Sequence, residues 1–115
     1  MAESCIFCRI AAGDVPARLV YHDDDVTVFH DANPQAPVHL LVVPNRHITS
    51  LAEATADDGD LLGKLLLACA EAARRAGIAD SGFRVVTNTG TDAGQAVFHL
   101  HLHVLGGRRL SGSLG

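Results

Sequence analysis

The nine residues Val97–Leu105 alternate between apolar side chains and histidines, and no other segment limits the possible folds as strongly. Because successive side chains of a β-strand point to opposite faces, this alternation predicts a strand with its apolar residues facing the core. The core-facing residues are Phe98, Leu100, Leu102 and Val104, and the opposite face carries His99, His101 and His103. The β-branched and aromatic content also favours a strand over a helix. The three histidines are therefore expected in one row, with neighbours about 6.5 Å apart.

A row of three histidines is compatible with a solvated surface, a metal site, or nucleophilic catalysis assisted by flanking histidines. Two further histidines, His39 and His47, bracket an apolar segment, and a glycine-containing loop over 90–95 runs directly into the histidine row. Glycines let backbone N–H groups approach an anion closely. No Walker lysine follows these glycines, so the loop is not a P-loop.

The rest of the chain predicts an α+β domain: an antiparallel β-sheet of about five strands, with one long helix on one face and a short N-terminal helix. An acidic turn between two strand-like segments indicates a hairpin, and Thr55 is a suitable N-cap for the long helix. The expected elements are a helical turn over 5–12, strands over 18–22, 25–31, 38–43, 83–88 and 97–105, and a helix over 56–76. The apolar stripe of that helix is expected to be Leu61, Leu62, Leu65, Leu66 and Cys69.

Length and charge restrict the classes of protein. The 115 residues suit a single domain over 1–115, with a glycine- and serine-rich tail over 106–115 that is expected to be mobile. A formal net charge of -4 argues against nucleic-acid binding through a basic patch. No apolar stretch is long enough to span a bilayer and no targeting segment is visible, so we expect a cytoplasmic protein without a membrane partner.

Cys5 and Cys8 form a C-x-x-C pair, which suits metal binding, two reduced thiols or redox chemistry. The surrounding sequence lacks the βαβ pattern typical of thioredoxin-like redox motifs. With two histidines, the pair would complete a Cys2His2 site of the kind that holds structural zinc.

The segment His99-Leu100-His101-Leu102-His103-Val104-Leu105 resembles the His-φ-His-φ-His-φ-φ motif of the histidine triad (HIT) family. The segments 29–39, 42–47 and 94–98 are also similar to that family, and the resemblance extends over about residues 5–109. It is nearest to the Hint branch, which hydrolyses purine nucleoside phosphoramidates.

This resemblance implies that His101 attacks the α-phosphorus of a purine nucleoside 5'-phosphoramidate and forms a nucleotidyl-histidine. It implies that His39 and His103 hydrogen-bond phosphate oxygens and that Asp31 accepts the ribose hydroxyls. It implies that phosphate is positioned by Asn88, Gly94, Gln95 and Val97. It also implies that the base binds in a slot formed by Phe7, Ile10 and Phe29. The implied zinc ligands are Cys5, Cys8, His47 and His99, in a closed structural site that takes no part in the chemistry. The family also implies a homodimer.

The sequence departs from the Hint pattern in two places. Many Hint proteins have serine where this chain has Ala96, and animal Hint proteins carry a tryptophan near the C-terminus that this chain lacks. The leaving-group preference is therefore open, and a dinucleoside polyphosphate hydrolase of the Fhit type is an alternative. Two alternatives come from other classes: a zinc-stabilised nucleotide-binding or protein-interaction module with little turnover, and a metal-storage or redox protein.

Overall fold

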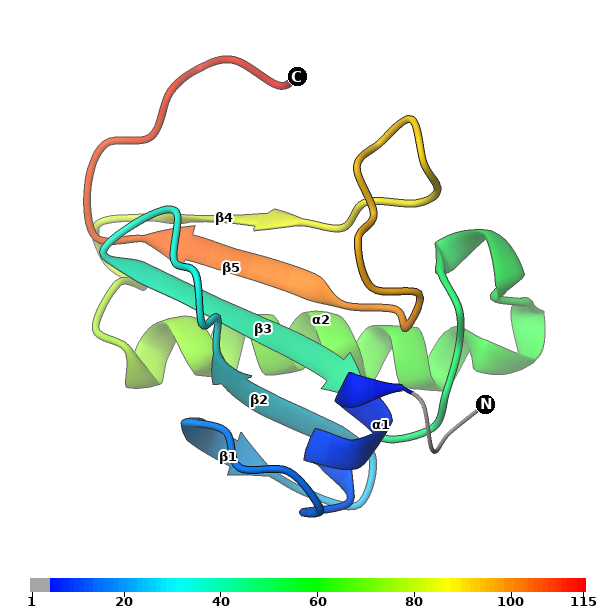
Figure 1. Ribbon diagram of the computed structural model, residues 1–115. Coiled ribbons are helices and arrows are strands. Elements are labelled where there is room, and N and C mark those ends of the chain that lie inside the picture. Colours follow the sequence, from blue (N-terminus) through cyan, green and yellow to red (C-terminus); the bar gives the residue numbers. More distant parts are fainter. Residues whose placement is uncertain (1–4) are drawn as a thin grey trace.

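The computed structural model describes residues 5–115 and has the predicted α+β architecture (Figure 1). Five strands form one antiparallel sheet in the order β1-β2-β3-β5-β4. The strands are β1 (Leu19–His22), β2 (Val26–His30), β3 (Val38–Pro44), β4 (Phe83–Val86) and β5 (Leu102–Gly106), and the helices are α1 (Ile6–Ala11) and α2 (Gly59–Arg75). Helix α2 covers one face of the sheet, and α1 lies on the other face, beside β3. No helix within residues 5–115 is long and apolar enough to cross a membrane.

The core is divided by the sheet into two layers. Leu40 and Val42 of β3 belong to the layer under α2, whereas Leu41 and Val43 belong to a smaller cluster that also contains Phe7 of α1. Because β3 is the central strand and is covered on both faces, it shows a continuous apolar run instead of alternation. The smaller layer leaves part of its sheet face open for a site.

The final strand begins later than predicted. Strand β5 starts at Leu102, and residues 97–101 are irregular. Phe98, expected on the core face, is 51% exposed, whereas His99, expected on the open face, is fully buried. The β3–β5 register pairs Val42 with Leu102, so a longer strand would place Leu100 opposite Pro44, which has no N–H group for the ladder. The Leu100 N–H donates instead to the Ile48 carbonyl.

The neighbouring strand is also shorter than the range 83–88 that was predicted. Strand β4 ends at Val86, opposite His103. The Thr87 hydroxyl then donates to the His101 carbonyl at 2.8 Å, so a side chain replaces the ladder bond beyond that point. Strands β4 and β5 therefore stop pairing within the histidine segment, so the three histidines have different surroundings.

The long helix begins with a capped turn, as expected from Thr55. Residues Ala56–Asp58 form a 3-10 turn, the Thr55 hydroxyl accepts from the Asp57 N–H, and the Asp58 carboxylate accepts from the Thr55 N–H. The predicted apolar stripe was wrong at Leu66, which is 58% exposed. The buried residues of α2 are Leu65, Ala68, Cys69, Ala72 and Ala73. Small alanines therefore bring this helix close to the sheet.

Candidate active site

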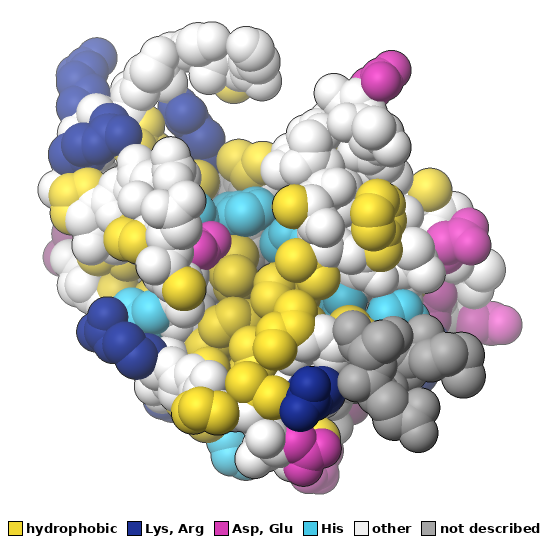
Figure 2. All heavy atoms as spheres, in the orientation of Figure 1, with side chains coloured by type: hydrophobic (Ala, Val, Ile, Leu, Met, Phe, Trp, Pro, Cys, Tyr) yellow, Lys and Arg dark blue, Asp and Glu magenta, His cyan; other side chains and the backbone are white. Residues whose placement is uncertain are grey.

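A cavity of about 630 Å³ opens on the face of the sheet that α2 does not cover. Phe7 and Ile10 of α1 and Phe29 of β2 line it, and the rings of Phe7 and Phe29 meet edge to face at a centroid distance of 5.5 Å. Figure 2 shows apolar side chains along this hollow, with histidines at one end. The three residues predicted to form a base slot are thus brought together in one apolar cavity.

Asp31, His101, His103 and Val97, all of which the sequence had singled out, also line the cavity. His39 lies behind them, with its Nε2 atom 2.8 Å from Nδ1 of His103 and 3.3 Å from Oδ2 of Asp31. The site is therefore built where β2, β3 and β5 lie side by side, because His39 and His103 sit on adjacent strands. A carboxylate, the imidazoles of His101 and His103 and an apolar slot therefore share one opening, with the His39 ring behind them.

His101 is held in a single orientation. Its Nδ1 atom lies 2.7 Å from the His99 carbonyl oxygen, which can only accept, so Nδ1 carries the proton of the neutral ring. The lone pair is then on Nε2. The ring packs edge to face against Phe7 at 5.1 Å and is 7% exposed. His101 lines the cavity, and an imidazole with a free Nε2 lone pair is chemically able to act as a nucleophile.

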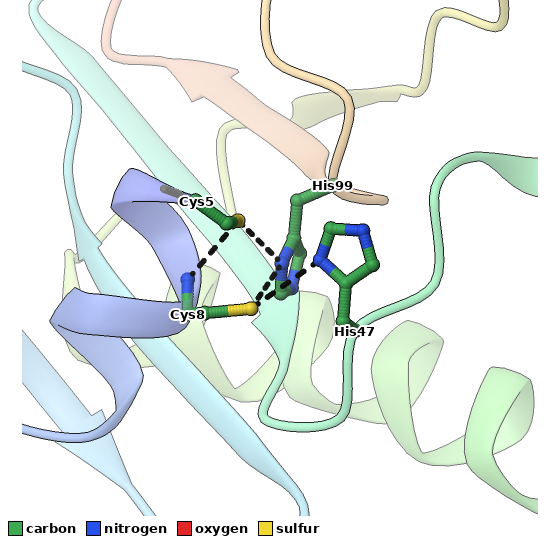
Figure 3. Close-up of side chains that lie close together, drawn as sticks. All are labelled: Cys5, Cys8, His47 and His99. Carbon is green, nitrogen blue, oxygen red and sulfur yellow. Dashed lines mark hydrogen bonds between the residues drawn. The ribbon is translucent and has the colours of Figure 1, made fainter. Parts of the chain in front are cut away.

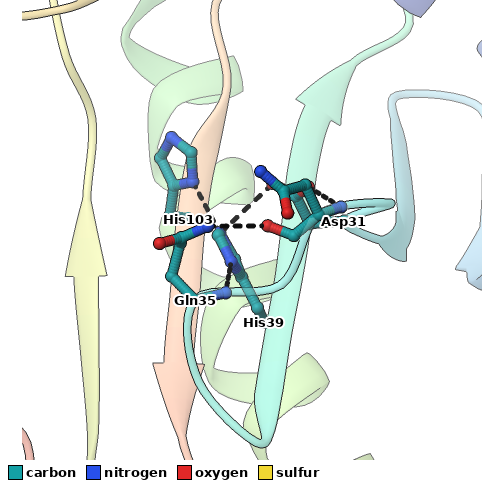
Figure 4. Close-up of polar contacts among 5 residues, drawn as sticks. Asp31, Gln35, His39 and His103 are labelled. Carbon is teal, nitrogen blue, oxygen red and sulfur yellow. Dashed lines mark hydrogen bonds and ion pairs between the residues drawn. The ribbon is translucent and has the colours of Figure 1, made fainter.

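His39 and His103 form an ordered donor–acceptor chain (Figure 4). The Gln35 backbone N–H donates to His39 Nδ1 at 3.0 Å, so the neutral His39 ring carries its proton on Nε2. That proton is donated to His103 Nδ1, which is the nearer of its two acceptors. His103 must then carry its own proton on Nε2, where it is available as a donor.

Burial keeps both rings of this chain neutral near pH 7. It lowers the pKa of His39, although nearby Asp31 opposes the shift. Burial, reinforced by the adjacent His101 and His39, lowers the pKa of His103 to about 4. Both imidazoles therefore act as neutral hydrogen-bonding groups whose tautomers are set by their partners.

The third histidine of the motif, His99, faces a different site on the N-terminal side of α1 (Figure 3). Cys5, Cys8, His47 and His99 converge there, and their four ligand atoms lie within 4.8 Å of one another. The distances from Cys5 Sγ and Cys8 Sγ to His99 Nδ1 are 3.2 and 3.4 Å, and Cys8 Sγ lies 3.3 Å from His47 Nδ1. These distances are close to the separation of about 3.5 Å that is expected between the sulfur and nitrogen ligands of a tetrahedral zinc ion.

The chemistry of this cluster also fits a cation. His99 Nε2 donates to the Pro44 carbonyl at 2.8 Å, which leaves the lone pair of Nδ1 directed at the sulfurs, as in a metal-bound histidine with a backbone partner. In the protein alone, burial and the adjacent Cys5 raise the pKa of the Cys8 thiol to about 11. A bound cation would supply the charge needed to hold both sulfurs as thiolates.

Asp31, His39 and His103 also bring three potential ligand atoms together, but their protons argue against a second metal site. Both nitrogens of His39 are in use, since Nδ1 accepts from Gln35 and Nε2 donates to His103. A metal at Nε2 would need that proton removed. This cluster is better described as a proton-ordered chain beside the cavity.

Of the residues expected to position phosphate, only one lines the large cavity. Asn88, Gly94 and Gln95 lie outside the lining of the large cavity, which Val97 joins. The Gly94 and Gln95 N–H groups bond within their own loop, to the Thr91 and Gly90 carbonyls. The buried Gln95 amide donates to the Thr49 and Val97 carbonyls, and so anchors the segment that leads to the histidines.

Sequence reasoning missed one backbone group of the site and several residues that line the cavity. The Gln35 backbone N–H has no side-chain signal, although the flanking Pro34 and Pro37 indicate a rigid loop close to His39. Leu41, on the central strand, also lines the cavity and was assigned only to a buried strand.

Comparisons with known proteins find relatives that are similar over nearly the whole chain. The purine nucleoside phosphoramidase of Escherichia coli K12 is 43% identical over 110 residues, which cover 96% of this chain and 92% of that protein. Protein HitA of Neisseria gonorrhoeae is 48% identical over 104 residues, covering 90% and 96% of the two chains. A HIT family hydrolase from Legionella pneumophila superposes with a TM-score of 0.95 at 40% identity, covering 97% of this chain and all of that chain.

A histidine triad protein from Clostridium difficile also superposes, with a TM-score of 0.92 at 43% identity and 95% coverage of both chains. The family model of the HIT domain matches residues 12–110, which include His39, Asn88 and all three histidines of the row. By its sequence, its fold and the arrangement of its histidines, this chain belongs to the HIT domain family.

Proposed function

We propose that this HIT family hydrolase cleaves purine nucleoside 5'-phosphoramidates through a nucleotidyl-histidine intermediate on His101. The observation that carries the proposal is the orientation of His101, whose Nδ1 is fixed by the His99 carbonyl while the ring lines the cavity. The activity named for the Escherichia coli relative supports the choice of substrate.

In the proposed first step, the lone pair of His101 Nε2 attacks the α-phosphorus, and the P–N bond to the amine breaks. The amine takes a proton from solvent water as it leaves, and the nucleotidyl group remains on His101. In the second step, water attacks the same phosphorus and gives up a proton to the solvent, the bond to Nε2 breaks, and the nucleoside monophosphate is released. A neutral imidazole suits this role because it needs no deprotonation near pH 7.

The cavity offers a separate group for each part of such a substrate. The apolar slot of Phe7, Ile10 and Phe29 suits a planar base, and the Asp31 carboxylate suits the ribose hydroxyls. His103 presents Nε2–H as a donor, because its Nδ1 already accepts from His39. Such a donor, fixed before the substrate binds, would stabilise the negative charge that develops on the phosphoryl oxygens.

We propose further that Cys5, Cys8, His47 and His99 hold a structural zinc ion. With four protein ligands the ion would have no open position for substrate, so it would stabilise the fold and supply no catalytic step. It would connect α1 to the segment before β5. Because Phe7 of α1 lines the cavity, the ion would also hold Phe7 in place there. A reducing compartment such as the cytoplasm would keep these cysteines available as ligands.

The proposed activity is tested by measuring AMP release from adenosine 5'-phosphoramidate and from a diadenosine polyphosphate. We expect the wild type to prefer the phosphoramidate and His101→Ala to lose about 10³-fold or more in kcat/KM. AMP should still bind the variant, because the base and ribose contacts remain. The exposed His22 on β1 offers a matched control, and His22→Ala should keep full activity.

Two outcomes would contradict the proposal. Undiminished turnover by His101→Ala would remove His101 from the mechanism. A wild type that binds AMP but hydrolyses neither substrate would instead identify a nucleotide-binding module.

A further inference from the structure

The loop over residues 31–37, between β2 and β3, is ordered by its own polar groups. The Asn33 N–H donates to the Asp31 carboxylate at 2.8 Å, and the Gln35 side-chain amide donates to the Asn33 carbonyl at 3.1 Å. The Gln35 backbone N–H is thereby directed at His39 Nδ1 (Figure 4). This backbone group is the start of the proton chain that ends on His103.

Loss of the Gln35 contact would allow the chain to reverse. With Nδ1 unpaired, His39 can carry its proton there and offer Nε2 as an acceptor. His103 would then donate from Nδ1 to His39, and its own Nε2 would become a lone pair. In that arrangement His103 repels a phosphoryl oxygen instead of binding it. The direction of a single backbone N–H therefore decides which of two neutral states the pair adopts.

The segment after β5 holds this loop from outside. Gly107 has φ +92°, and a Cβ there would lie 2.9 Å from Pro37 Cβ, so the chain crosses the loop at a point where only glycine fits. The next residue, Arg108, donates through Nη2 to the Gln35 carbonyl at 3.2 Å. Its Nη1 atom donates to the Arg109 carbonyl at 3.0 Å, which fixes the direction of the guanidinium.

We propose that Arg108 is a positioning residue for the reaction at His101: by holding Gln35, it keeps the His39–His103 pair in the state in which His103 Nε2 is a donor. Arg108 does not line the cavity, and it acts only by restraining Gln35, whose carbonyl it binds and whose N–H, on the preceding peptide, faces His39. The kinetic part of this inference rests on the proposed function, whereas the state of the two rings does not.

The test compares Arg108→Ala, Arg108→Lys and the control Arg109→Ala in the full chain. Arg109 is the exposed neighbour, and its carbonyl, the group that contacts Arg108, is kept in the alanine variant. The protonated nitrogen of His39 and of His103 is identified by two-bond ¹H–¹⁵N correlation spectra in the absence of substrate. The kcat and KM for adenosine 5'-phosphoramidate are measured on the same samples.

We expect Nε2–H alone on both rings of the wild type and of Arg109→Ala, and a mixture of tautomers in Arg108→Ala. The kcat of Arg108→Ala should fall about tenfold with an unchanged KM, since a misdirected donor affects the charged transition state most. Arg108→Lys should recover part of both effects, because an ammonium group can still donate to the carbonyl. If Arg108→Ala does not fold, Arg108→Met, which keeps most of the side-chain packing but cannot donate to the Gln35 carbonyl, gives the same spectroscopic test.

A single Nε2–H tautomer in Arg108→Ala, or equal changes in Arg109→Ala, would overturn the inference. Failure of the proposed function has a different signature. A wild type without turnover would refute the phosphoramidase, while mixed tautomers confined to the Arg108 variants would still support the positioning role.

Discussion

The three histidines of the motif are chemically distinct because each uses a different nitrogen to contact the protein. His99 donates from Nε2 to a carbonyl and keeps Nδ1 for the sulfurs, whereas His101 donates from Nδ1 and keeps Nε2 for the cavity. His103 accepts at Nδ1 and keeps Nε2–H as a donor. The same side chain is thus suited to the three roles proposed above, a ligand, a nucleophile and a hydrogen-bond donor, and the hydrogen-bond partner of each ring determines which nitrogen stays available.

The half-buried, neutral state of His103 predicts how stability depends on pH. The pKa of this ring falls from 6.5 to about 4 on folding, so between these pH values the unfolded chain binds a proton that the folded chain does not. The free energy of unfolding should therefore decrease as pH falls from 6.5 towards 4. With allowance for partial exposure to water, we expect His103 to account for a loss of about 1 kcal/mol between pH 7 and pH 5.

Urea unfolding of the wild type and of His103→Gln at pH 7, 6 and 5 measures this contribution. The wild type should lose more stability than the variant over this range. Acid also weakens metal binding, but both proteins carry the same cysteines, so that effect cancels in the difference. Equal losses in the two proteins would show that His103 titrates alike in the folded and unfolded states.

At the scale of elements, the strand–helix order was predictable, but the points where strands end were not. The alternation of 97–105 continues through Val97–His101 although that segment is not a strand, since sequence periodicity cannot show that Pro44 lies opposite Leu100. The prediction of one row of histidines failed for the same reason. His101 and His103 have ring centroids 5.1 Å apart, whereas His99 turns away to His47 at 5.0 Å.

The end of β5 depends on a glycine that packs against the α2 layer. A Cβ at Gly106 would lie 2.7 Å from Cδ1 of Ile78 and 3.2 Å from the Gly82 carbonyl oxygen. We expect Gly106→Ala to lower the free energy of unfolding by about 1–3 kcal/mol, as overpacked cores do. Adding Ile78→Val, which removes Cδ1, should restore part of this loss. Urea unfolding of the single and double variants measures the interaction free energy between positions 106 and 78.

The control for this prediction is Gly112→Ala. Gly112 has no atom within 4 Å of its would-be Cβ, so the change should fall within about 0.5 kcal/mol of zero. A Gly106→Ala variant as stable as Gly112→Ala would mean that β5 can shift to make room.

The proposed zinc ion predicts that α1 depends on metal for its position. Metal analysis of protein purified without chelators should give about one equivalent of zinc, and Cys5→Ser with Cys8→Ser should lose it. Phe7 lies between the two cysteines on α1, so metal loss should weaken AMP binding as well as lower the Tm. Cys69→Ala, which changes the buried third cysteine in the core, should keep the metal. Folded wild type that contains no metal, or zinc retained by the double serine variant, would contradict this role.

At the scale of the whole molecule, the sheet has two edge strands, β1 and β4, and we propose that two copies of the chain associate through the β4 edge. Strand β4 pairs only with β5 in the described residues, so its other side presents free N–H and C=O groups. Phe83 and Val85 are each 37% exposed, and both pair with β5 residues, Gly106 and Val104, that face α2. An apolar margin therefore runs along this edge on the helical side.

Helix α2 contributes to the same margin. Lys64 bonds Asp25 at the β1 side of the sheet, and a spacing of about 100° per residue places Leu66 on the opposite flank, towards β4. Leu66 is 58% exposed, whereas the neighbouring Leu67, 70% exposed, joins Tyr21 and Lys64 on the β1 side. We propose that Leu66, Phe83 and Val85 form a homodimer interface in which two β4 strands pair about a two-fold axis.

If this interface is correct, a charge at Leu66 should dissociate the dimer, whereas the same charge at the adjacent Leu67 should not. Leu66→Glu would place two like charges near the axis and should shift the protein from dimer to monomer in sedimentation at micromolar concentration, as should Val85→Glu. Leu67→Glu adds the same charge to the same helix on the other flank, and it should remain a dimer. A monomeric wild type would refute the dimer, and equal dissociation by both leucine variants would move the interface away from β4. Because β4 borders the strand that carries His103, dissociation should also show whether the second copy supports the site.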